Sequence, residues 1–165
     1  MKQLITQLRI KYPTHKFRSG DQFSWSPETK EIIYKSSSGK NATWSLLHET
    51  GHALLGHQSY KADFELVRLE IDAWQKAREV AHELDITISE DHIEDCLDTY
   101  RDWLYKRSIC PNCGTKSVQQ DDYIHYRCFN CSTVWKVTAS RFCRAYRSTK
   151  NVVQPSTLHL SNNLS

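Results

Sequence analysis

The chain has 165 residues, of which 39% are hydrophobic, and a formal net charge of +3. This length suits one domain of ordinary size or a small domain with an appendage. No apolar run approaches the roughly 18–20 residues of a membrane-spanning helix, and the N-terminus lacks the apolar core of a signal peptide. We therefore expect a cytoplasmic protein with no membrane partner.

A helix and a hairpin are predicted at the start of the chain. Leu4, Ile5 and Leu8 have helical spacing within residues 2–12, and a proline follows. The segment 23–35, "FSWSPETKEIIYK", alternates around a Pro-containing turn and is typical of a β-hairpin. We expect the hairpin to form a small antiparallel sheet.

Three longer helices are predicted after the hairpin. The first covers about 42–55 and ends near Gly56, a typical C-cap residue. The second covers 62–84. The third covers roughly 90–107 and follows Ser89, a residue type that favours helix starts.

The first of these helices contains the segment "SLLHETGHALLGH", residues 45–57. His48 and His52 are four residues apart and therefore lie on one helix face, where both imidazoles can reach one zinc ion. Glu49 is placed to take a proton from a metal-bound water, as in the HExxH pattern. The alternative, a helix with surface histidines, fits poorly because the segment is largely apolar.

A catalytic zinc site needs a third protein ligand. Position 58, six after His52, is glutamine, so a third histidine at that spacing is absent. Glu70 falls on the apolar face of helix 62–84, where a carboxylate needs a metal or a cation. We expect Glu70 to be the third ligand. A buried pair with an arginine is the alternative reading of Glu70, and Asp72, on the charged face, is the alternative ligand.

The segments "HETGHALLGH" and "LEIDAW" together resemble the ImmA/IrrE family of metallopeptidases, over about residues 30–105. The resemblance implies an α+β, gluzincin-like mini-protease domain and a cytosolic zinc endopeptidase. It also implies a specific intracellular protein substrate, such as a transcriptional repressor, because several members of the family cut one.

Two further features of a protease site are expected. Residues 31–35 are the candidate edge strand for an extended substrate. The group that stabilises the oxyanion is left open among His57, Tyr60, His82 and Tyr100, with His82 expected on the surface.

Two CxxC pairs follow, separated by fourteen residues. Four thiolates at this spacing predict a closed, tetrahedral structural zinc site, a zinc ribbon, formed by Cys110, Cys113, Cys128 and Cys131. Four thiolates also suit iron. Two disulfides are the less favoured alternative, because a cytosolic compartment keeps thiols reduced. The sequence thus predicts two zinc ions, one catalytic and one structural.

The charge distribution supports a modular chain. Residues 1–102 carry 13 basic and 17 acidic side chains, whereas residues 103–165 carry 9 and 2. We expect a metallopeptidase domain at 1–107, the zinc ribbon at 108–137, and a basic exit segment with a disordered tail at 138–165. The basic side chains make nucleic acid a candidate partner, and a solubilising or substrate-binding surface is the alternative.

Two other functions compete with this hypothesis. A SprT-like protease also joins HExxH to a C-terminal ribbon and acts on DNA-bound proteins, but it usually has a third histidine ligand. The chain can also be a nucleic-acid or protein-binding adaptor whose protease site is inactive. The intact Glu49 favours an enzyme.

Overall fold

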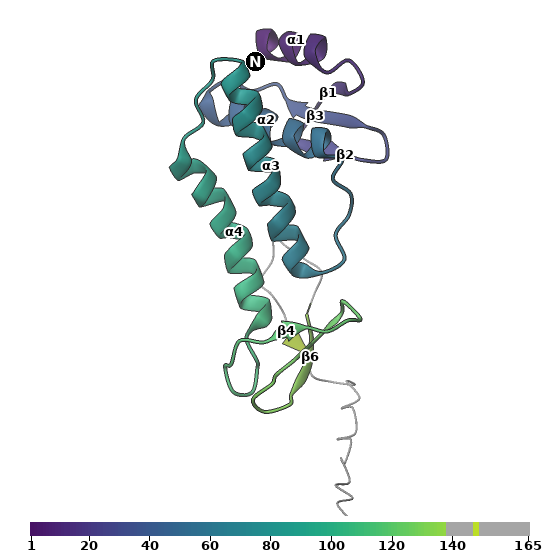
Figure 1. The fold of residues 1–165 in the computed structure, drawn as a ribbon, viewed down its shortest axis with the longest axis vertical. Coiled ribbons are helices and arrows are strands. Elements are labelled where there is room, and N and C mark those ends of the chain that lie inside the picture. The colour runs from purple at the N-terminus through teal and green to yellow at the C-terminus, as the bar shows by residue number, and fades with distance from the viewer. Residues whose placement is uncertain (138–146, 149–165) are drawn as a thin grey trace, which may run out of the picture. The chain divides into compact units, whose positions relative to one another are not determined.

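The structure, a computed structural model, describes residues 1–137 and the backbone of residues 147–148. It belongs to the α+β class, with four helices and two small sheets in the described part. The chain divides into two compact units, Met1–Arg101 and a second unit that begins at Asp102 (Figure 1). The predicted segment 138–165 lies outside the described residues, apart from 147–148.

All four predicted helices are present, and their ends lie within two residues of those expected. They are α1 (Lys2–Lys11), α2 (Lys40–Leu55), α3 (Asp63–Glu83) and α4 (Glu90–Ser108). Gly56 caps α2 as predicted: its φ is 64°, and its N–H donates to the carbonyls of Ala53 and His52. A left-handed φ is easily adopted by glycine, which ends the helix here.

The sheet of the first unit differs from the prediction. The expected hairpin is confirmed as β2 (Ser24–Ser26) antiparallel to β3 (Glu31–Lys35). An unpredicted strand, β1 (Lys16–Gly20), pairs with β3 in parallel, so the sheet is mixed, not antiparallel. The strand order is β1-β3-β2, which makes β3 the central strand. The prediction that residues 31–35 form an edge is therefore wrong, and the edges are β1 and β2.

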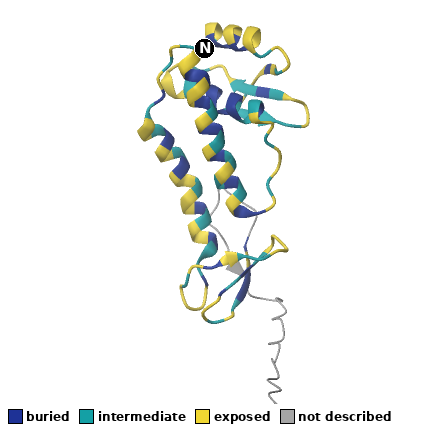
Figure 2. Ribbon diagram, viewed as in Figure 1, coloured by how far each residue is buried: buried dark blue, intermediate teal, exposed yellow. Residues whose placement is uncertain are grey.

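The core of the first unit lies between the helices and one face of the sheet. Leu8, Ile32, Leu46 and Leu47 are completely buried in it, and Figure 2 shows buried residues along the facing sides of α2 and α3. The two helices are in close contact at Gly51, where an added Cβ would lie 2.4 Å from the carbonyl oxygen of Ala73. This close contact brings the ligand-bearing faces of α2 and α3 together.

The second unit contains an antiparallel sheet in the order β4-β5-β6-β7. Its strands are β4 (Val118–Gln119), β5 (His125–Arg127), β6 (Val134–Val137) and β7 (Arg147–Ser148). Tyr126 and Trp135 stack with ring centroids 5.6 Å apart, and the Trp135 indole donates to the carbonyl of Arg107. This small core lies beside the cysteine cluster.

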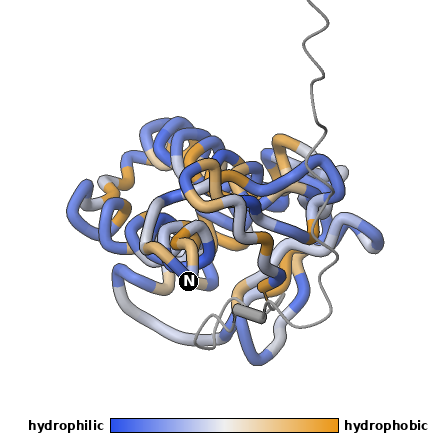
Figure 3. The backbone as a smooth tube through the Cα atoms, turned by 90° about the horizontal axis from the view of Figure 1, so that it is seen from below, coloured by the Kyte–Doolittle hydropathy of each residue, from blue (hydrophilic) through white to orange (hydrophobic). Residues whose placement is uncertain are grey.

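Hydrophobic and hydrophilic residues alternate along the helices (Figure 3). Within the described part of the chain, no helix is both long enough and apolar enough to cross a bilayer.

Candidate metal centres

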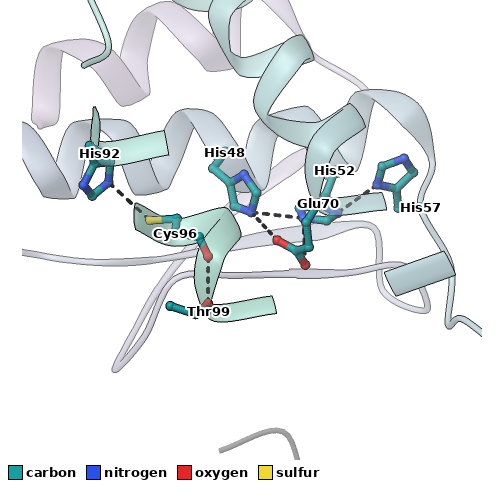
Figure 4. A network of polar contacts seen from close by, with 7 residues as sticks. All are labelled: His48, His52, His57, Glu70, His92, Cys96 and Thr99. Atoms are coloured by element: carbon teal, nitrogen blue, oxygen red, sulfur yellow. Dashed lines mark hydrogen bonds and ion pairs between the residues drawn. The ribbon is translucent and has the colours of Figure 1, made fainter. Parts of the chain in front are cut away.

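The first candidate centre is formed by α2 and α3. His48 and His52 lie one turn apart on α2, and Glu70 reaches them from α3 (Figure 4). The Nε2 atom of His48 lies 3.1 Å from Glu70 Oε2 and 3.1 Å from the Nε2 atom of His52. The distance from His52 Nε2 to Glu70 Oε1 is 3.6 Å. Two imidazoles from α2 and one carboxylate from α3 therefore present their donor atoms to one point.

These distances fit a metal ion. In a tetrahedral site with metal–nitrogen bonds of about 2.0–2.1 Å, neighbouring ligand atoms lie about 3.3–3.4 Å apart. The three observed distances lie close to this value, and the group can hold a metal ion. Three protein donors leave one tetrahedral position for water or substrate, as in catalytic rather than structural zinc sites.

The carboxylate in this group is Glu70 and not Asp72. Glu70 is only 5% exposed. Burial alone would raise the pKa of Glu70, but the hydrogen bonds with His48 and His52 outweigh burial and lower its pKa. The carboxylate is therefore held in its ionised form, which is the form that binds metal.

His57 contacts the group from the other side of His52. The Nδ1 atoms of His52 and His57 are 2.8 Å apart, and the His57 carbonyl accepts a hydrogen bond from the Trp25 indole. Burial and the neighbouring His52 lower the pKa of His57. This favours the neutral His57 ring, whose Nδ1 can accept a hydrogen bond from the Nδ1–H of His52. This contact leaves His52 Nε2 with a free lone pair, as a metal ligand requires.

Glu49 is half-buried on the same helix. Burial raises its pKa, while His48, His52 and a hydrogen bond from the backbone N–H of Trp25 act in the opposite direction. A carboxylate with a raised pKa beside a candidate metal centre is a candidate general base. The HExxH motif predicts the same role for Glu49.

A pocket of about 370 Å³ opens beside the centre and is lined by His48, Glu49 and Glu70. Its far wall is α4, which contributes His92, Cys96, Thr99 and Tyr100. Figure 4 shows His92 and Cys96 on the opposite side of His48 from His57.

Among the four candidates for stabilising an oxyanion, the pocket includes Tyr100 and not His57, Tyr60 or His82. His82 is exposed, as expected. His92, which lines the pocket, was not among the predicted site residues. The only signal for it was the spacing of His92, Cys96 and Tyr100, which places the three residues on one helix face.

The second candidate centre is a cluster of the four predicted cysteines. The Sγ atoms of Cys110 and Cys131 are 3.6 Å apart, and those of Cys113 and Cys128 are 3.5 Å apart. A tetrahedral zinc with bonds to sulfur of about 2.3 Å places its ligands about 3.8 Å apart. The four thiols of this cluster are free, so the disulfide alternative is wrong for them.

Both CxxC segments adopt the same turn. The N–H of Gly114 donates to the carbonyl of Cys110, and the N–H of Ser132 donates to the carbonyl of Cys128. Gly114 and Ser132 occupy matching positions and both have positive φ values, 73° and 59°. Two equivalent knuckles therefore face each other across the four sulfurs, with no position left for a substrate.

The basic side chains of residues 103–165, which make nucleic acid a candidate partner, are only partly described. Arg127 is half-buried and Lys136 is exposed on neighbouring strands of the second unit. The side chains of Arg141, Arg144, Arg147 and Lys150 lie outside the described residues.

Comparisons of the chain with protein-family models, with curated proteins and with solved structures gave no match.

Proposed function

We propose that the chain is a zinc-dependent endopeptidase of the gluzincin type that cleaves a specific intracellular protein. The observation that carries this proposal is one pocket lined by two of the metal-binding side chains and by Glu49. The resemblance to the ImmA/IrrE family extends the proposal to a substrate such as a transcriptional repressor.

In this proposal His48, His52 and Glu70 hold the catalytic zinc. When bound, the ion would supply the Lewis acidity that polarises the scissile carbonyl and lowers the pKa of the attacking water. Glu49 accepts the proton of that water and delivers it to the leaving amine. Tyr100, which lines the same pocket, is the candidate donor to the oxyanion.

In this proposal the substrate backbone pairs with the edge strand β2, because β3 is the central strand and has no free edge. One edge of β2 is paired with β3. The backbone N–H of Trp25 interacts with Glu49, which places the other edge of β2 beside the proposed general base. An extended peptide added along this edge would bring a scissile bond to the pocket.

The identity of the third donor favours this proposal over a SprT-like protease. Within the described residues, the carboxylate of Glu70 joins His48 and His52, and no third histidine does so. We propose a separate, structural role for a zinc ion at the four cysteines, because a closed thiolate site leaves no position for chemistry.

The test is the zinc content per chain of the wild type and of Glu70→Ala, measured by elemental analysis. We expect two equivalents in the wild type and about one in Glu70→Ala. Asp72→Ala is the matched control and should keep two. One equivalent in both the wild type and Glu70→Ala would leave only the four-cysteine site, and the adaptor function would replace the protease.

A further inference from the structure

Two buried ring nitrogens beside the first centre have no hydrogen-bond partner among the described residues. They are Nδ1 of His48 and Nε1 of Trp74. Trp74 is only 3% exposed. Its ring packs on that of His48, with centroids 4.3 Å apart and an angle of 31° between the planes. The two unpartnered atoms therefore belong to neighbouring rings.

Both atoms are donors when the centre holds a metal ion. A histidine that binds metal through Nε2 carries its proton on Nδ1, and the indole nitrogen is always a donor. Leaving a buried donor without an acceptor is costly, so such groups are rare in folded proteins.

Three of the other four indoles donate to a backbone carbonyl. The N–H of Trp25 donates to the carbonyl of His57, that of Trp44 to Thr87, and that of Trp135 to Arg107. Trp74 differs from these three because it lines the pocket next to Glu49 and Glu70. Its N–H is the one indole donor of the pocket wall that has no acceptor among the described residues.

The remaining walls of the pocket indicate which kind of acceptor would suit this N–H. Ser45 and Thr99 contribute hydroxyl groups, Phe23 and Tyr100 contribute aromatic rings, and no lysine or arginine is among the lining residues. A substrate carboxylate is disfavoured here, because the pocket offers it no cationic side chain and places it near Glu49 and Glu70. A neutral amide can instead accept from Trp74 and donate to the hydroxyls.

We propose that this pocket binds an asparagine or glutamine side chain next to the scissile bond, and that Trp74 recognises it through its indole N–H. This inference rests on the proposed peptidase function and adds the class of side chain that the enzyme selects. A site built to hydrogen-bond a polar group discriminates against an analogue of the same shape that lacks it.

The test uses three peptide hydroxamates that differ in one side chain, that of leucine, asparagine or aspartate. These side chains have nearly the same shape, so their affinities compare polarity and charge. Dissociation constants are measured with the zinc-loaded full chain, for the wild type, for Trp74→Phe and for Trp44→Phe. The Trp44 variant is the control because it removes an indole N–H that already has a backbone partner.

We expect the wild type to bind the asparagine compound more tightly than the other two. Trp74→Phe should reduce the preference for asparagine over leucine about tenfold, the value of one hydrogen bond. Trp44→Phe should leave this preference unchanged. The indole N–H resonance of Trp74, assigned by its loss in Trp74→Phe, should move downfield when the asparagine compound binds.

An unchanged preference in Trp74→Phe, or tightest binding of the leucine or aspartate compound by the wild type, would overturn the inference while leaving the peptidase proposal standing. Failure of the zinc-loaded wild type to bind any of the three hydroxamates would contradict both.

Discussion

His52 and His57 are joined through their Nδ1 atoms, which lie 2.8 Å apart. His57 directly follows the left-handed Gly56, whose turn ends α2 and directs the chain back towards His52. The contact orients a candidate metal-ligating imidazole through its second nitrogen, and such outer contacts raise the metal affinity of a ligating histidine.

His57→Ala should therefore weaken zinc binding at the first centre by roughly 10–100-fold, the usual effect of losing an outer partner of a ligating histidine. Competition with a zinc-sensitive dye would measure this loss. His57→Asn should recover part of the affinity, because its amide oxygen can accept from His52. His82→Ala is the control for an exposed histidine, and equal affinities for the His57 and His82 variants would contradict the positioning role.

Glu49→Gln should separate metal binding from catalysis. Glu49 lines the pocket but does not belong to the group that can hold a metal. We expect two zinc equivalents per chain and a loss of cleavage of roughly 10²–10⁴-fold, as for the removal of a general base. Mass spectrometry of a peptide library, with the wild type as reference, would measure cleavage. Cleavage at the wild-type rate would eliminate Glu49 as the base.

The helices and the two candidate metal-binding groups were predictable from sequence because their signals are local. A helix repeats every 3.6 residues, so the spacing of His48 and His52 already placed both imidazoles on one face. The apolar face of α3 likewise singled out Glu70, because a buried carboxylate requires a partner. The spacing of the two CxxC pairs likewise implied the cysteine cluster, because four thiolates at this spacing suit one zinc ion.

The mixed sheet and the pocket were not predictable in this way. β1 has the sequence KFRSG, in which only Phe17 is buried, so it lacks the alternation that identifies a strand. β1 pairs with β3, a strand that lies further along the chain, and this pairing makes residues 31–35 the central strand of the sheet and not its edge. Trp74 and His92 appeared as ordinary helix residues until the packing of α2, α3 and α4 brought them into one pocket.

Gly51→Ala should disrupt the first centre without altering any ligand. A Cβ at this position would lie 2.4 Å from the carbonyl oxygen of Ala73, and a backbone atom of a packed helix moves only if α2 and α3 separate. Overpacking of this kind costs about 1–3 kcal/mol. We expect a lower melting temperature and weaker zinc binding at the His/Glu centre.

Asn41→Ala is the matched control for Gly51→Ala, because residue 41 is exposed on the same helix. A Gly51→Ala protein as stable as the control, with two zinc equivalents, would show that the close packing of α2 and α3 does not position Glu70.

Zinc binding by the four cysteines should strengthen as the pH rises. Burial raises the pKa of Cys110 to about 11, whereas hydrogen bonds with Thr133 and Asn112 lower that of Cys131 to about 5. At pH 7 Cys131 is already a thiolate, but Cys110 must release its proton on binding. Each proton released contributes about a tenfold gain in affinity per pH unit. Calorimetry in buffers of different ionisation enthalpy would count the protons, and a constant affinity from pH 6 to 8 would contradict the prediction.

Cys128→Ser should unfold the second unit and leave the first unit folded. The Cys128 sulfur is almost fully buried, and the small core of Tyr126 and Trp135 beside the cluster is too limited to fold without metal. We expect the loss of one zinc equivalent and a red shift of tryptophan fluorescence as Trp135 becomes exposed, while the zinc held by His48, His52 and Glu70 remains. Cys96→Ser, outside the cluster, should retain both ions. Loss of both ions from Cys128→Ser, with a collapse of the whole melting transition, would mean that the first unit depends on the ribbon for its own stability.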